Sequence, residues 1–239
     1  MPNLVDILAF GAHPDDVVAC AGGTLIKSQR QGYKVGILDL TSGGNSETAG
    51  SQTRLDESKI SAKTMSVRYL GNLHLPERKL TSIENENIIV KEIRKYKPKI
   101  AIIPHWHDRH KSHRDASQLL ERAIQTAKYS KILPKLKPHK VKVVLYYMIH
   151  YEFDPAFIFD ISKVHDKKMK SLYKHKSQFF HKKSKGVYTK KLLDPDFIEA
   201  WIARSRWYGY ISGFKYGEAF DMRRSPGLDN LSCLKNLYR

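Results

Sequence analysis

Short apolar runs alternate with amphipathic stretches over the first 130 residues of the chain. The runs that we expect to form buried strands are 4–10, 34–40, 67–73 and 100–104. The stretches between them repeat apolar residues at helical spacing, and we expect helices at 24–31, 51–65, 84–96 and from His113 to about 129. Alternating strands and helices at this spacing predict an α/β fold with a mostly parallel sheet and right-handed crossovers.

The rest of the chain is rich in lysine and is interrupted by proline. Residues 131–142 should form an exposed connection, because Pro134 and Pro138 break regular structure. Beyond it we expect strands at 143–149 and 156–161, a helix at 163–180, a loop at 179–191 and a helix from about 194 to 209. We expect a single domain over 1–239, in which 1–130 form the catalytic core and the basic portion 131–239 completes the fold.

Four polar residues, His13-Pro14-Asp15-Asp16, directly follow the first predicted strand. Ligands of open α/β sheets bind at the carboxyl ends of the strands, which is where this loop should lie. His13 and Asp16 offer one nitrogen and one oxygen ligand, suited to zinc or a similar divalent metal. Asp15 lies between them and could face a bound water. A catalytic zinc has three protein ligands and one open position, so a third ligand must come from elsewhere.

A second cluster, residues 105–113 (HWHDRHKSH), follows the predicted strand at 100–104. If the strands at 4–10 and 100–104 are neighbours, their loops emerge side by side at the switch point of a doubly wound sheet. A lone histidine in a loop is usually a solvent-exposed or capping residue, but two such clusters at strand ends are far more specific. The pattern therefore predicts a metal site built from both loops, at the carboxyl edge of the sheet.

The net charge of the chain is strongly positive and unevenly distributed. The chain carries a formal charge of +18, of which +4 falls in residues 1–120 and +14 in residues 121–239. Residues 163–191 hold eleven lysines against one acid, Asp166. An alternative function is therefore binding to nucleic acid or to another anionic surface. Lysine on a helix face is more often simply solvated, so nucleic-acid binding is the less favoured hypothesis.

Targeting signals and cysteine usage bear only on the expected location of the protein. Apolar runs are too short to cross a membrane, and no basic start precedes an apolar segment, so we expect neither a membrane span nor a cleaved signal. Cys20 and Cys233 lie far apart without metal-binding spacing. A reducing cytoplasm is the simplest location.

Several motifs together resemble the PIG-L/LmbE-type zinc N-deacetylases. They are the AHPDD loop, the GGT that follows it, Arg54 and Glu57 on one predicted helix, and the DRHxxH loop ending at His113. The resemblance covers most of the chain and implies a Rossmann-like three-layer fold with the active site at the carboxyl ends of the strands. Within the family, the chain most resembles the deacetylases of bacillithiol biosynthesis, which act on N-acetylglucosaminyl malate.

The resemblance also implies roles for individual residues. His13, Asp16 and His113 would bind zinc or another divalent metal, and Asp15 would be the general base. His110 would donate a hydrogen bond to the oxyanion or act as the general acid. One departure affects His110, because the family usually reads H-P-D-H where this chain has Lys111 and Ser112 before His113. Serine supplies no charge to an imidazolium, and Asp108 or Asp115 could compensate.

Two arginines are candidate substrate anchors. Arg54 and Arg109 lie near strand ends, and guanidinium groups bind carboxylates in pairs of hydrogen bonds, which suits a malate group. An equally weighted alternative for Arg54 is an ordinary pair with Glu57 on the same helix. His105 and His107 could line the pocket.

The expected function is therefore hydrolysis of the acetamide of an N-acetylglucosamine conjugate, with the malyl conjugate favoured. The alternative enzyme deacetylates another N-acetyl sugar, such as diacetylchitobiose. We expect a homo-oligomer, because relatives often assemble and the apolar C-terminal helix could form an interface.

Overall fold

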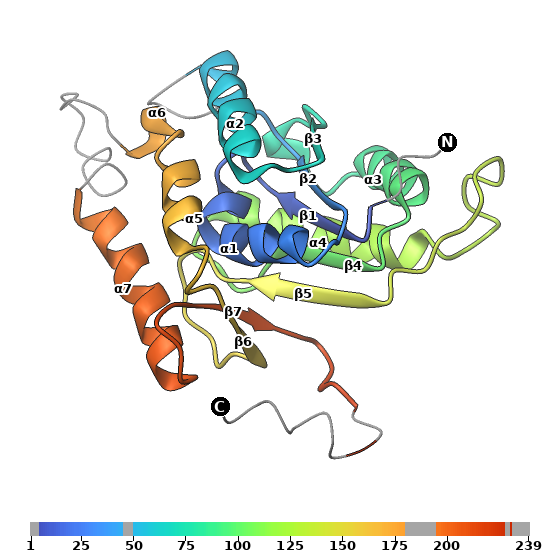
Figure 1. Cartoon of the computed structure of the whole chain (residues 1–239). Helices are drawn as coiled ribbons and strands as arrows, with labels where there is room; N and C mark the ends of the chain where they lie inside the picture. The colour runs from blue at the N-terminus through green and yellow to red at the C-terminus, as the bar shows by residue number, and fades with distance from the viewer. Residues whose placement is uncertain (1–4, 45–49, 180–194, 228–229, 231–239) are drawn as a thin grey trace.

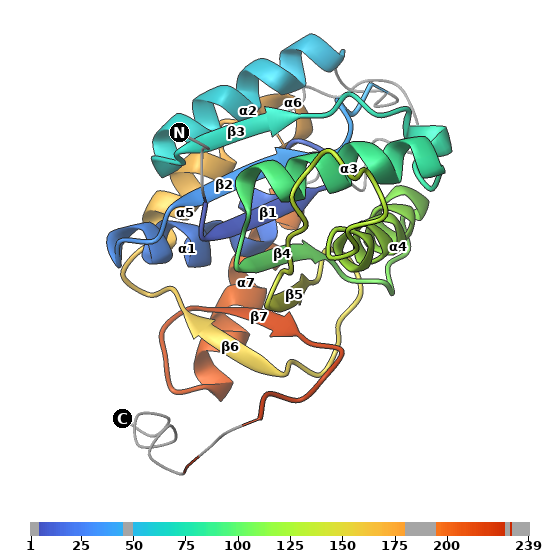
Figure 2. The same cartoon turned by 90° about the vertical axis from the view of Figure 1, so that its right-hand side faces the viewer.

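A seven-stranded sheet forms the centre of the computed structural model, which describes residues 5–44, 50–179, 195–227 and 230. The order is β3-β2-β1-β4-β5-β7-β6, with β3 at one edge and β6 at the other (Figure 2). The strands are β1 (Ile7–Gly11), β2 (Val35–Asp39), β3 (Tyr69–Asn72), β4 (Ile100–Pro104), β5 (Val143–Tyr147), β6 (Phe157–Asp160) and β7 (Gly217–Asp221). The first five strands are parallel, whereas β7 is antiparallel to β5 and β6.

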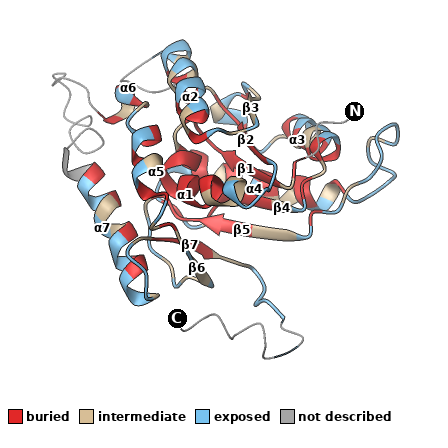
Figure 3. Cartoon of the chain, in the orientation of Figure 1, coloured by how far each residue is buried: buried red, intermediate tan, exposed pale blue. Residues whose placement is uncertain are grey.

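Helices cover both faces of this sheet (Figure 1). The helices are α1 (Asp16–Arg30), α2 (Ser51–Met65), the 3-10 helix η1 (Glu77–Lys79), α3 (Ile83–Tyr96), α4 (Lys111–Thr126), α5 (His165–Leu172), α6 (Lys176–Phe179) and α7 (Pro195–Ile211). One apolar cluster joins the sheet to α1, α2 and α5, and a second joins the opposite face to α3 and α4. Burial on both faces explains why the strands read as continuous apolar runs (Figure 3).

The arrangement of β1 and β4 places the candidate site. Ile7 of β1 lies opposite Val35 of β2 on one side and Ile100 of β4 on the other. From β1 the chain adds β2 and then β3 on one side of β1. It then crosses back and adds β4 on the other side of β1. The loops after β1 and β4 therefore emerge side by side, and the predicted α/β fold with its mostly parallel sheet is confirmed.

The first helix begins earlier than the sequence pattern indicated. It starts at Asp16 rather than at Thr24, so Gly23 lies inside the helix. A Cβ at Gly23 would lie 2.8 Å from Ile161, so this position is glycine because α1 packs closely there. The backbone N–H groups of Gly23 and Thr24 donate to the buried carboxylate of Glu218 on β7, at 2.9 and 2.7 Å.

Two further predictions are corrected in the second half. The helix expected at 163–180 is divided into α5 and α6, with a turn near His175 between them. The strand β7 was not predicted at all, although it joins β5 to β6 and carries Glu218, which also pairs with the buried Lys168 at 2.7 Å. The loop expected at 179–191 lies, apart from Phe179, outside the described residues.

Candidate metal centre

The loop after β1 folds back onto the start of α1. The backbone N–H of His13 donates to the Asp16 carboxylate at 2.9 Å, and Asp16 is the first residue of the helix. The N-terminus of a helix favours a negative charge, so the Asp16 carboxylate is stabilised in the first turn of α1 and is a potential ligand. Both side chains are buried, with 7% of His13 and 6% of Asp16 exposed. This local fold therefore holds two of the predicted ligands, His13 and Asp16, next to each other.

The third predicted ligand, His113, reaches that point from the first turn of α4. Its Nε2 lies 3.3 Å from Nδ1 of His13 and 3.5 Å from Oδ1 of Asp16. The other oxygen of Asp16, Oδ2, lies 3.5 Å from Nδ1 of His13. A tetrahedral zinc with bonds of about 2.0–2.1 Å separates its ligands by about 3.3–3.4 Å. The separation of the two histidine nitrogens and the two-histidine, one-carboxylate donor set therefore fit a catalytic zinc or a similar divalent metal, with one Asp16 oxygen facing each histidine.

Asp108 holds His113 from behind. Its Oδ1 lies 3.1 Å from Nδ1 of His113 and 2.9 Å from Nδ1 of His150, and it accepts the backbone N–H of His110 at 2.7 Å. Burial raises the pKa of Asp108, but these histidine contacts outweigh it and hold the pKa far below its usual value. A carboxylate on the far nitrogen fixes the tautomer and orientation of a ligating histidine, which leaves Nε2 of His113 directed at the centre.

Glu77 holds His13 in the corresponding way. The carboxylate Oε1 lies 3.0 Å from Nε2 of His13, while Nδ1 of the same ring faces Asp16. Burial lowers the pKa of His13, but Asp16 and Glu77 outweigh burial and raise the pKa to about 10. Glu77 belongs to η1, which follows β3, so this acid reaches the centre from a third strand end.

Ser112 connects His13 to His110. Its hydroxyl lies 3.2 Å from Nε2 of His13 and 2.6 Å from Nδ1 of His110. His110 lies at the surface, but partial burial of its ring lowers its pKa to about 4, and the neighbouring His113 and His13 add to the shift. A neutral imidazole at this position can donate through Nε2 once Nδ1 is engaged by Ser112, which suits an oxyanion donor.

Asp15 differs from the other acids because its partner is an arginine. The Arg54 guanidinium donates to Asp15 Oδ1 at 2.5 Å and to the carbonyl of Gly43 at 3.2 Å. A Cβ at Gly43 would collide with this guanidinium. Gly43 also has φ of +65°, so both the space and the backbone conformation favour glycine there. Arg54 is buried with 6% of its surface exposed and does not pair with Glu57, which instead accepts from Ser177.

A further acid, Asp39, lies beneath the loop at the end of β2. It is buried, and its Oδ2 lies 3.5 Å from the Ser58 hydroxyl. Burial, with Asp16 and Asp15 nearby, holds the pKa of Asp39 well above its usual value. The raised pKa favours the neutral form of Asp39, which would place no additional negative charge against the two aspartates of the loop.

The remaining predicted residues lie at the periphery. Arg109 is exposed on the loop before α4, next to His110, and His107 is exposed as well. His105 is buried between the rings of Trp106 and Phe153, with Nε2 3.3 Å from Asp221, so it is part of the packing beside β7. Asp115, one of the two acids considered as support for His110, pairs with Lys111 instead.

Sequence patterns did not single out Glu77, His150 or Asp39. Glu77 follows a strand, as the metal-binding loops do, and this was its only signal. His150 follows β5 in the same manner. Both could have been found by asking which titratable residues come just after each parallel strand.

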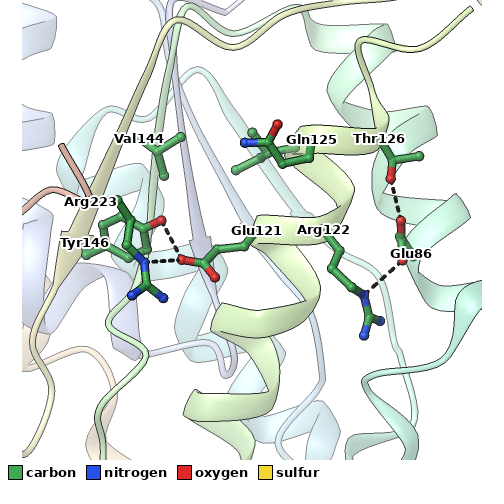
Figure 4. Close-up of a pocket in the computed structure, with 9 residues that line it drawn as sticks. Glu86, Glu121, Arg122, Gln125, Thr126, Val144, Tyr146 and Arg223 are labelled. Atoms are coloured by element: carbon green, nitrogen blue, oxygen red, sulfur yellow. Dashed lines mark hydrogen bonds and ion pairs between the residues drawn. The ribbon is translucent and has the colours of Figure 1, made fainter.

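The groove between α4 and β5 is a separate feature, of about 500 Å³ (Figure 4). Its two arginines are already paired, Arg122 with Glu86 at 3.0 Å and Arg223 with Glu121 at 2.8 Å. None of the residues predicted to bind metal or substrate lines it. The groove therefore adds nothing to the metal centre.

Comparisons with known proteins found related deacetylases. A family model described as PIG-L, GlcNAc-PI de-N-acetylase, matches residues 8–124. Diacetylchitobiose deacetylase of Thermococcus kodakarensis is 30% identical over 242 residues, which cover 93% of this chain and 84% of that relative.

Solved structures show the same fold. A conserved protein of Thermus thermophilus has a TM-score of 0.84 at 26% identity, covering 94% of this chain and 97% of its own. The N,N'-diacetylchitobiose deacetylase of Pyrococcus horikoshii has a TM-score of 0.76 at 23% identity, covering 90% and 82%. Among the described residues, no helix is long and apolar enough to span a bilayer. The strand-end cluster and the near full-length relative together show that this chain belongs to the PIG-L family of de-N-acetylases.

Proposed function

We propose that this chain hydrolyses the acetamide of an N-acetylglucosamine conjugate in a metal-dependent reaction. The observation that carries the proposal is the convergence of His13, Asp16 and His113 at ligand spacing, with Asp15 on the same loop. A divalent metal held there would polarise the amide carbonyl and lower the pKa of the attacking water, and zinc fits the donor set best. Among the described hydrogen bonds of the Asp15 side chain, only Oδ1 is engaged, by Arg54, so Oδ2 is available to a water.

The side chains around the proposed metal site have different roles in the reaction. Asp15 takes a proton from the water as it attacks the carbonyl carbon, and later returns a proton to the departing amine. Arg54 holds Asp15 in place, which replaces the substrate-anchoring role expected from its sequence position. His110, held by Ser112, donates through Nε2 to the oxygen that gains charge in the tetrahedral intermediate.

Two substrates remain candidates for this site. Diacetylchitobiose is favoured by the 30% identical relative, whose name gives that activity. N-acetylglucosaminyl malate, the substrate of the bacillithiol pathway, is favoured by the sequence resemblance and by exposed Arg109 beside His110, which could bind a malyl carboxylate. Since Arg54 is committed to Asp15, only one of the two expected arginine anchors is open to a ligand.

Acetate release from a small panel tests the proposal. The panel holds N-acetylglucosaminyl malate, diacetylchitobiose and free N-acetylglucosamine, each assayed with zinc-loaded and chelated protein. Release from at least one conjugate, abolished by chelation and restored by zinc, is the expected result. No release from any of the three would overturn the proposed substrate class.

The Arg109→Ala variant separates the two substrates. If the malyl conjugate is the substrate, this variant should raise KM for it about tenfold or more while leaving diacetylchitobiose unaffected. The matched control is Lys95→Ala, which removes an exposed cation of α3. Equal effects on both substrates would contradict a carboxylate-binding role for Arg109.

We also propose that residues 1–239 act as one catalytic unit. The sheet supports this, since β1 to β4 come from the first 130 residues and β5 to β7 from the remainder. The buried Glu218 of β7 further ties the second portion to α1, whose first residue is Asp16.

A further inference from the structure

Glu77 contacts a proposed metal ligand, although the proposed chemistry assigns it no task. Its carboxylate lies 3.0 Å from Nε2 of His13, and 16% of the Glu77 side chain is exposed against 9% of that of His13. The contact joins residues 64 positions apart, so it exists only because the loop after β3 lies beside the loop after β1. It is a product of this strand order and not of the local loop sequence.

The same ring nitrogen faces Ser112. The Ser112 hydroxyl lies 3.2 Å from Nε2 of His13, and 2.6 Å from Nδ1 of His110. A continuous series of contacts therefore runs from Glu77 through His13 and Ser112 to His110. Ser112 adds no charge to this series, and among the described residues Glu77 brings a carboxylate within hydrogen-bond distance of Nε2 of His13.

The two acids that could have replaced a carboxylate at position 112 are engaged elsewhere. Asp108 accepts from the backbone N–H of His110 and contacts the rings of His113 and His150. Asp115 pairs with Lys111 on the surface of α4. Glu77, on η1, contacts His13 and lies at the opposite end of this series of contacts from His110.

We propose that Glu77, on η1, is a positioning residue for His13. By accepting the Nε2 proton, Glu77 fixes the tautomer in which Nδ1 of His13 carries the lone pair directed at Asp16 and His113. The inference rests on the proposed metal site. It assigns each ligating histidine its own carboxylate, Asp108 for His113 and Glu77 for His13.

Zinc affinity, measured by competition with a chromophoric chelator at one fixed pH, tests this without any substrate. Glu77→Gln should lower the affinity about 10- to 100-fold, as expected when a carboxylate behind a ligating histidine is removed. The matched control is Glu86→Gln, since Glu86 has a similarly buried side chain (15% exposed) and pairs with Arg122 away from the centre.

Affinity of Glu77→Gln equal to that of the control would overturn the inference. If Glu77→Gln does not fold, the ring nitrogens of His13 in the zinc-loaded unchanged protein decide the matter by nitrogen-15 NMR. A proton on Nε2 with the metal on Nδ1 supports the role, and a proton on Nδ1 refutes it. Absence of zinc binding by the unchanged protein would instead remove the proposed metal site itself.

Discussion

Asp15 and Asp16 are adjacent in sequence, yet their surroundings give them different tasks. Asp16 faces two imidazoles, those of His13 and His113, which hold its pKa far below the usual value despite burial. Asp15 faces the guanidinium of Arg54 and retains one oxygen without a described partner. The first arrangement suits a ligand and the second suits a base.

The Asp15→Asn variant should keep its metal and lose about 10²- to 10⁴-fold in kcat, because it removes a general base and not a ligand. Asp16→Asn should instead lose most of its metal. Zinc content and acetate release, measured on both variants, check the assignment. Loss of metal in Asp15→Asn with retention in Asp16→Asn would mean that the two roles are exchanged.

The raised pKa of His13 predicts how the stability of chelated protein depends on pH. The folded value of about 10 exceeds the ordinary histidine value of about 6.5, so the stabilisation is complete below pH 6.5 and is lost as the pH rises through 10. Between pH 7 and 9.5, the free energy of unfolding of chelated protein should fall by up to about 3 kcal/mol more than that of chelated His13→Gln. Denaturant titrations at both pH values measure this difference, and parallel losses in the two proteins would exclude it.

At the scale of elements, the connection between α4 and β5 shows how a proline-rich, lysine-rich segment is fixed in place. Arg94 of α3 is buried and donates to five backbone carbonyls in this region, at 2.7–3.1 Å. They belong to Ala127, Tyr129, Ile132, Leu133 and Leu136. The connection was correctly predicted to be exposed, but the sequence pattern gave no sign that one arginine satisfies its backbone.

Replacing Arg94 by lysine should destabilise the fold by about 2–4 kcal/mol, because an ammonium cannot reach five acceptors and leaves carbonyls without donors. The matched control is Arg122→Lys, a half-exposed arginine that donates to Glu86 and to the Thr81 carbonyl, which should cost about 1 kcal/mol or less. Thermal and denaturant unfolding measure both. Equal losses in the two variants would show that the contacts of Arg94 contribute little.

At the scale of the whole molecule, the order of the strands decides which residues meet. The sequence predicted the four strands of the first half and the loops His13–Asp16 and 105–113, because buried strands and polar strand ends are local patterns. Glu77 and His150 were not predicted, since their approach to His13 and Asp108 depends on how the loops after β3 and β5 pack. Strand β7 was missed because glycine and glutamate interrupt its apolar pattern, and Glu218 is buried only through its contacts with Lys168 and α1.

The charge of the molecule is also distributed by this topology. The connection at 127–142 attaches at the amino ends of β4 and β5, where the Lys142 N–H donates to the Lys99 carbonyl at 2.9 Å. The metal centre lies at the carboxyl ends of the strands. The exposed lysines of the connection are therefore at the opposite edge of the sheet from the proposed catalytic residues.

The most direct test of the account is the zinc content of His13→Ala and His113→Ala, measured per chain by elemental analysis after loading with zinc and removal of the excess. Each variant deletes one of three ligands, so both should retain far less than one equivalent, and acetate release should be nearly abolished. The control is His139→Ala, which removes a histidine that contacts the Pro98 carbonyl and should keep a full equivalent. A full equivalent of zinc in both His13→Ala and His113→Ala would contradict the proposed centre.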